Sequence, residues 1–126
     1  MRWRTLLIAA TLALAGGGLR AQNTDVRMLV QSSPLAGFQF YQGKALWDEM
    51  KVGDMLALVR EADNPHDANA VRVEWRGRRL GYVPRRENRA VAQHMDRAGA
   101  VEARISKLVP HRNPWQRIEF EIYVKL

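Results

Sequence analysis

Short polar side chains crowd the stretch 60–73, which reads R-E-A-D-N-P-H-D-A-N-A-V-R-V. Asn64, Asp67 and Asn69 are residue types whose side chains bond to backbone groups two or three residues away, which favours a rigid folded loop. Pro65 fixes its own φ angle and disfavours a helical conformation at Asn64. A loop with this much local geometry loses little entropy on binding, so we interpret it as a preorganised ligand-binding loop. The alternative, a well-formed turn with no further role, stays open.

Carboxylates and one imidazole in the same stretch have the chemistry of a metal site. These residues are Glu61, Asp63, His66 and Asp67. Such groups can hold a divalent ion whose bound water hydrolyses a phosphodiester. No second histidine lies nearby, however, and the sequence has neither a Gly-rich phosphate loop nor a glycine-framed serine. We therefore expect no catalytic residue, no metal and no cofactor, with a metal-dependent phosphodiesterase as the least favoured alternative.

Aromatic and basic residues around the loop fit binding better than catalysis. Phe40, Tyr41 and Tyr82 provide rings on which bases or sugars can stack, and Arg85 opens a group of arginines able to contact phosphates. Small β-domains that bind single strands combine such stacking platforms with a cationic groove. The structural alternative is that the aromatic residues belong to the core and that the arginines only face solvent.

The first 21 residues have the three parts of a secretory signal peptide. Two arginines precede an apolar run over 6–15, and small residues precede a cleavage site near Ala21. The apolar run is shorter than the roughly 20 residues of a membrane-spanning helix, so we expect export to the periplasm or medium without a stable membrane span. Cleavage removes three arginines and no acidic residue, which lowers the net charge from +7 to +4. The absence of cysteine excludes disulfides and thiolate metal sites.

Strand-like patterns dominate the rest of the chain. Alternating apolar residues predict strands over 27–31, 55–59, 70–75, 80–83, 101–105 and 117–125, and a short glycine-bounded strand within 35–43. A helical turn is predicted over 44–50, and a helix from Pro84 to about Arg97. Many short strands with tight turns predict one mainly β domain over 22–126, a small barrel or sandwich with one main helix.

Four motifs at these spacings together resemble the HIRAN domain. The spacing between N-P-x-D-x-N-A and G-Y-V-P is their most specific feature, and the resemblance covers a core of about 30–109. The resemblance implies a small OB-like or SH3-like β-barrel, in agreement with the strand pattern. It also implies a binding module without enzyme activity, because the helicase and ATPase activities of larger HIRAN proteins belong to other domains. The motifs are G-F-Q-F-Y-Q-G at 37–43, V-G-D-M-L-A-L-V-R-E at 52–61, N-P-H-D-A-N-A-V-R-V at 64–73 and L-G-Y-V-P-R at 80–85.

The resemblance further implies a ligand, because the characterised member of the family captures the free 3′-hydroxyl end of single-stranded DNA. The ligand-binding residues that it implies are Phe40, Tyr41, Asn64, His66, Asp67, Tyr82 and Arg85. The first two match rings that stack on the terminal bases. Asp67, with the backbone around its loop neighbours, matches the group that bonds the terminal hydroxyl. Arg85 matches a phosphate contact, with Tyr82 beside it in the same pocket.

Three positions depart from the family's ligand-binding example. This chain has Phe40 in place of a tyrosine, His66 in place of an aromatic residue and Gln39 in place of a basic residue. A lost hydroxyl and a lost charge reduce the affinity that the resemblance implies. The expected partner is single-stranded DNA or another polyanion. The alternative is an exported module that binds a glycan, peptide or protein of the cell envelope.

Overall fold

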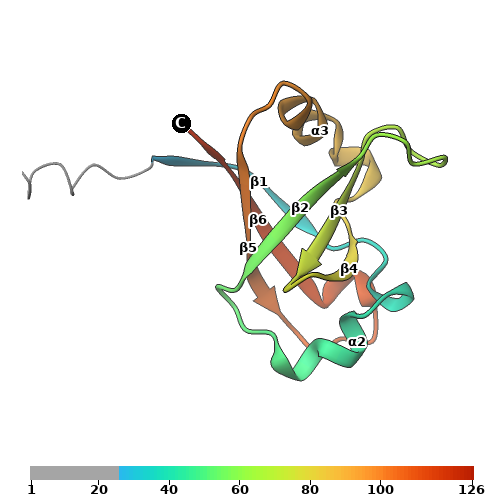
Figure 1. Ribbon diagram of the computed structural model, residues 1–126. Helices are drawn as coiled ribbons and strands as arrows, with labels where there is room; N and C mark the ends of the chain where they lie inside the picture. The colour runs from blue at the N-terminus through green and yellow to red at the C-terminus, as the bar shows by residue number, and fades with distance from the viewer. Residues whose placement is uncertain (1–25) are drawn as a thin grey trace, which may run out of the picture.

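The computed structural model describes residues 26–126 as six strands joined by short helices and turns (Figure 1). The strands are β1 (Arg27–Pro34), β2 (Met55–Glu61), β3 (Ala70–Trp75), β4 (Arg78–Tyr82), β5 (Val101–Leu108) and β6 (Ile118–Lys125). The helices are α2 (Gly43–Leu46) and α3 (Arg89–Asp96), and the 3-10 turns are η1 (Phe38–Phe40), η2 (Trp47–Glu49), η3 (Arg85–Glu87) and η4 (Pro114–Gln116). The signal peptide predicted over 1–21 lies outside the described residues. Within 26–126, no helix is long and apolar enough to cross a membrane.

The strands form one antiparallel sheet in the order β1-β6-β5-β2-β3-β4. Its two halves meet where β2 pairs with β5 through Met55–Arg104 and Leu56–Ala103. The mainly β class is confirmed, but the predicted barrel is wrong, because the sheet is not closed. Gly37, with a φ of 81°, turns the chain into η1 shortly after β1 ends. The edge strands β1 and β4 therefore do not extend along each other, and the contact there is one isolated bridge between Ala36 and Tyr82.

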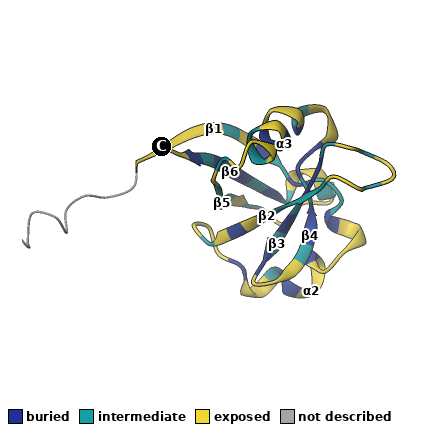
Figure 2. Ribbon diagram, turned by 45° about the horizontal axis from the view of Figure 1, so that its top comes forward, coloured by how far each residue is buried: buried dark blue, intermediate teal, exposed yellow. Residues whose placement is uncertain are grey.

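Apolar residues at alternating positions build the core between the two halves of the sheet (Figure 2). In β6 the apolar side chains are buried, while Glu119, Glu121 and Tyr123 between them are only partly buried. The buried apolar residues of this strand are Ile118, Phe120, Ile122 and Val124. The period of two along this strand is what a sheet with one covered face requires. The prediction of the last strand is therefore confirmed.

The short strand predicted within 35–43 is wrong, because this segment forms the turn η1 and then α2. Phe38 is buried in the core, where its ring meets Trp47 edge-on at 5.8 Å, whereas Phe40 is 74% exposed. A single buried ring anchors the turn, so the two phenylalanines do not share one face of a strand. The helical turn expected over 44–50 is confirmed, with Leu46 and Met50 in the core.

The helix predicted from Pro84 starts later than expected. A 3-10 turn, η3, follows Pro84, and α3 begins only at Arg89. Between them lies Asn88, which is buried and donates a hydrogen bond from Nδ2 to Oδ2 of Asp67 at 2.8 Å. This contact fixes the chain at the junction, so the local pattern of apolar residues does not decide where the helix begins. The helix buries Val91 and Ala92 against the sheet.

Gly81 of β4 lies against the Ala36–Tyr82 bridge, and a Cβ atom there would collide with the carbonyl oxygen of Ala36. We predict that Gly81→Ala lowers the free energy of unfolding by about 2–3 kcal/mol, because the backbone must shift to accept the methyl group. The control is Gly53→Ala, whose Cβ would meet no atom within 4 Å and which costs only the positive φ, about 1 kcal/mol. Urea denaturation of both variants makes the comparison. Equal losses would contradict the role assigned to the bridge.

Candidate functional site

A cavity of about 350 Å³ lies between the 62–69 loop and the edge strand β4. Six of the seven residues that the sequence predicts as ligand-binding line it: Tyr41, Asn64, His66, Asp67, Tyr82 and Arg85. The seventh, Phe40, lies in an adjoining groove that shares Tyr41 with this cavity. The loop itself projects beside α3 at the upper right of Figure 1. Residues from three distant parts of the sequence thus meet in one place, which we call the loop pocket.

The loop holds its own shape through side-chain bonds to its backbone. Oδ1 of Asn64 accepts from the backbone N–H groups of His66 and Asp67 at 2.8 and 3.2 Å. Oδ1 of Asp67 accepts in turn from the N–H of Asn69 at 2.9 Å. These are the local bonds that Asn and Asp favour in turns. The prediction that side chains of the loop bond to its own backbone is confirmed by this geometry.

A second set of contacts joins the loop to η3 and α3. Oδ2 of Asp67 accepts from the buried Asn88, and the carbonyl of His66 accepts from the guanidinium of Arg85 at 2.6 Å. Each carboxylate oxygen of Asp67 has one protein donor and can accept a further hydrogen bond. Sequence reasoning missed Asn88. Its only sequence signal is an amide residue just before a helix, and that signal predicts a helix cap rather than a tether.

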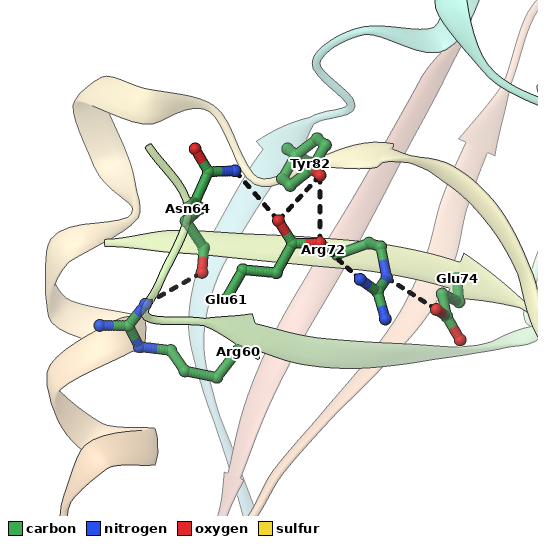
Figure 3. A network of polar contacts seen from close by, with 7 residues as sticks. Arg60, Glu61, Asn64, Arg72, Glu74 and Tyr82 are labelled. Atoms are coloured by element: carbon green, nitrogen blue, oxygen red, sulfur yellow. Dashed lines mark hydrogen bonds and ion pairs between the residues drawn. The ribbon is translucent and has the colours of Figure 1, made fainter. Parts of the chain in front are cut away.

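The Glu61 carboxylate lies behind Asn64 and Tyr82, which line the loop pocket and form its back wall, and it binds three other elements (Figure 3). Oε1 accepts from the hydroxyl of Tyr82 on β4 at 3.0 Å and from Nδ2 of Asn64 at 3.0 Å. Oε2 forms an ion pair with Arg72 of β3, whose Nε also binds Glu74 at 2.7 Å. The sequence gives no indication of this network, because its members are up to 21 residues apart.

The network shifts the pKa values of its acid and its phenol in opposite directions. Burial by itself raises the pKa of Glu61, but the hydrogen bonds from Asn64, Arg72 and Tyr82 outweigh burial and lower it below 4.5. Burial and the neighbouring Glu61 carboxylate raise the pKa of Tyr82 above 10.0. Glu61 is therefore a charged acceptor and Tyr82 a protonated donor at neutral pH. The back wall of the pocket is a fixed polar surface.

Aromatic rings and one cation form the open side of the pocket. The ring of Tyr41 lies 5.9 Å from that of Tyr82 and is 36% exposed, and the more exposed Phe40 precedes Tyr41 at the end of the turn η1. Arg85 is exposed and uses one guanidinium nitrogen for the carbonyl of His66. Its other N–H groups remain available to an anion. The site thus combines stacking surfaces, a cation and a carboxylate.

The acidic residues of the loop are not arranged as a metal site. Glu61 faces β3 and β4, whereas Asp67 faces Asn88, and both Asp63 and His66 are exposed. Within residues 26–126, no group of three or more His, Cys, Asp or Glu side chains is placed to hold an ion. The geometry therefore offers nothing in favour of the phosphodiesterase alternative.

Comparison with known proteins identifies relatives of the whole described region. The family model described as the HIRAN domain matches residues 28–126. Among solved structures, a protein from Lactobacillus plantarum matches with a TM-score of 0.71 and 23% identity, over 81% of this chain and 98% of that one. The HIRAN domain of human HLTF matches with a TM-score of 0.56 and 21% identity, over 79% and 77% of the two chains. No significant match is found among curated protein sequences.

The lowered pKa of Glu61 makes stability depend on pH. A carboxyl group with a lowered folded-state pKa stabilises the fold above its unfolded value of 4.5, and that contribution is lost as pH falls through the folded-state value. We predict that the free energy of unfolding falls less between pH 5 and pH 2 in Glu61→Gln than in the wild type. Urea denaturation of both proteins at several pH values measures this fall in the free energy of unfolding.

The matched control is Glu119→Gln, which neutralises a more exposed carboxylate 3.9 Å from Lys107. We expect this control to keep the wild-type pH dependence. If Glu61→Gln and the wild type lose the same stability on acidification, the network does not hold Glu61 in its charged form.

Proposed function

The chain belongs to the HIRAN domain family, known for DNA-binding modules that are generally non-catalytic, and we propose that it binds single-stranded DNA ends with a free 3′-hydroxyl. The observation that carries this proposal is the loop pocket. It gathers a partly buried carboxylate, an exposed cation and two adjoining aromatic residues from separate segments. These are the groups that a nucleotide terminus needs for its hydroxyl, its phosphate and its base.

Asp67 is the proposed acceptor for the terminal hydroxyl. Its two oxygens are fixed by the Asn69 N–H and by Asn88, so the carboxylate does not have to be ordered when a strand binds. A hydroxyl can donate to a remaining lone pair of the carboxylate, whereas a terminal phosphate brings negative charge against it. Glu61 behind the pocket adds to that repulsion. The site therefore distinguishes a free 3′-hydroxyl from a 3′-phosphate.

The aromatic residues and Arg85 are the proposed contacts to the base and the backbone phosphate at the end of the strand. Phe40 is a large ring with 74% of its surface exposed, so its face is accessible to a base. Stacking of a base on such a ring tolerates any sequence, because every base has a flat π-face. Arg85 provides the charge for a backbone phosphate at the mouth of the pocket.

We also propose, from the pattern of residues 1–21, that the domain acts after export and signal-peptide cleavage near Ala21. Its DNA ligand would then be met in the periplasm or outside the cell. A cell-envelope glycan, peptide or protein is the alternative ligand for the same pocket. A strong loss of affinity with added salt would support DNA as the ligand, since the binding of phosphates releases counterions.

Asp67→Asn tests the recognition of the hydroxyl. We predict that the wild type binds a single strand with a free 3′-hydroxyl about 10–100-fold more tightly than the same strand with a 3′-phosphate, the range for a hydrogen bond to a charged group. The variant should lose most of that preference, because its amide carries no charge. Fluorescence anisotropy at low salt measures the affinity of the wild type and the variant for both strands.

The control for Asp67→Asn is Asp63→Asn, which removes an exposed carboxylate in the same loop that does not line the pocket. Thermal unfolding of each variant checks that the loop stays folded. Equal wild-type affinity for the two strands would exclude recognition of the 3′-hydroxyl. No binding of either strand at low salt would favour an envelope ligand instead.

Phe40→Ala tests stacking. Because one base stacked on an aromatic ring contributes about 1–3 kcal/mol, we predict a loss of affinity of about 5–150-fold for single-stranded DNA. The unfolding temperature should barely change, since the ring is mostly exposed. Val52→Ala, at a residue that is 61% exposed and lines neither the pocket nor the adjoining groove, is the control. Unchanged affinity in Phe40→Ala would show that the ring does not contact the strand.

A further inference from the structure

The groove that adjoins the loop pocket has a volume of about 610 Å³ and follows the β3–β4 hairpin. Beginning at Tyr41, which it shares with the pocket, it passes Arg72 and Arg79 and reaches Gly77 in the hairpin turn. The antiparallel pairs Arg72–Tyr82 and Glu74–Arg79 place these residues along the hairpin in that order. We call this surface the β4 groove. Of its residues, Phe40 and Tyr41 alone take part in the contacts proposed so far.

The two arginines that line the β4 groove differ in their ion pairs. Arg72 is held between Glu61 and Glu74, so its charge is offset by two carboxylates. Arg79 differs, because within residues 26–126 no carboxylate forms an ion pair with its side chain. Its guanidinium lies over the ring of Tyr41, 5.1 Å from the ring centre. A cation without an ion-pair partner among the described residues thus lies at the boundary between the groove and the pocket.

The neighbours of Arg79 suit a sugar–phosphate backbone. Its carbonyl accepts from the N–H of Gln42 at 3.1 Å, which joins β4 to the turn that carries Phe40 and Tyr41. Bases stacked on those rings would therefore have their connecting phosphates near the guanidinium. At the far end, a Cβ on Gly77 would meet no atom within 4 Å, so the turn leaves room for a chain to pass. Arg76 and Arg78 flank that glycine and are exposed.

We propose that the β4 groove binds the phosphodiester backbone on the 5′ side of the captured end, with Arg79 as its phosphate-binding residue. This inference rests on the proposed function and gives the strand a direction, from the loop pocket along β4 toward the hairpin turn. The opposite side of the pocket offers a smaller cavity of about 330 Å³ at Arg86 and Trp115. That cavity connects to the pocket through Arg85, whose guanidinium already binds the loop backbone.

The test compares Arg79→Ala with Arg86→Ala as the matched control. A ten-nucleotide strand with a free 3′-hydroxyl is titrated by fluorescence anisotropy between 50 mM and 300 mM salt. We expect Arg79→Ala to reduce the slope of log affinity against log salt by about 0.7, the value for one phosphate contact on a single strand. At 50 mM salt that slope corresponds to a loss of about 5–10-fold. Arg86→Ala should change affinity by less than about twofold.

Arg79→Lys separates charge from packing, because it keeps the cation but not the planar group that lies on Tyr41. A phosphate contact is supported if Arg79→Lys recovers the wild-type salt slope. It also requires that the unfolding temperature of Arg79→Ala stays close to that of the wild type. A reduced slope in Arg86→Ala together with an unchanged slope in Arg79→Ala would overturn the inference, since the strand would then leave by the other side.

Two outcomes distinguish this inference from the proposed function. If the wild type keeps its preference for a free 3′-hydroxyl over a 3′-phosphate and Arg79→Ala has no effect, only the role of the β4 groove is wrong. If the wild type binds both strands equally or neither strand, the proposed function itself fails, and the inference fails with it.

Discussion

The Glu61 carboxylate joins the end of β2, the first part of the loop, β3 and β4 through its bonds to Asn64, Arg72 and Tyr82. Without it, the back wall of the loop pocket would have a tyrosine hydroxyl and an amide donor with no acceptor in a partly buried place, which costs stability. The same carboxylate gains its lowered pKa from these donors. One partly buried acceptor thus fixes both the shape of the pocket and the protonation states of its wall.

The opposite wall depends on a second tether, in which Asp67 binds Asn88 and the loop carbonyl of His66 binds Arg85. The two sets of contacts hold the loop from both sides, so its functional groups do not have to be ordered by a ligand. Preorganisation of this kind raises affinity because little conformational entropy is lost on binding. It also explains how a loop whose residues are mostly exposed or half-buried can present one carboxylate in a defined direction.

The charge that the site presents to a ligand depends on which of its acidic and basic side chains already have partners. The acids of the pocket and groove are engaged, with Glu61 and Glu74 bound to Arg72 and Asp67 bound to neutral donors. Arg79 and Arg85 keep most of their hydrogen-bonding capacity for a ligand. A domain of modest net charge can therefore attract a polyanion locally, since nearby charges dominate over the total at physiological salt. The same pairing keeps the carboxylates from acting together as a metal site.

The sequence by itself determined the elements whose pattern is local. The alternation in β6, the hairpin of β3 and β4 and the self-bonded loop around Asn64 follow from residue types at short spacing, and the seven candidate site residues came from a resemblance in motif. Only the tertiary structure decided the rest. The barrel stays open because Gly37 redirects the chain after β1, the segment 35–43 turns because Phe38 enters the core while Phe40 stays exposed, and Asn88 delays α3 by bonding Asp67. Glu61, Asn88 and Arg79 contact partners far away in the sequence, and such contacts leave no periodic pattern in the chain.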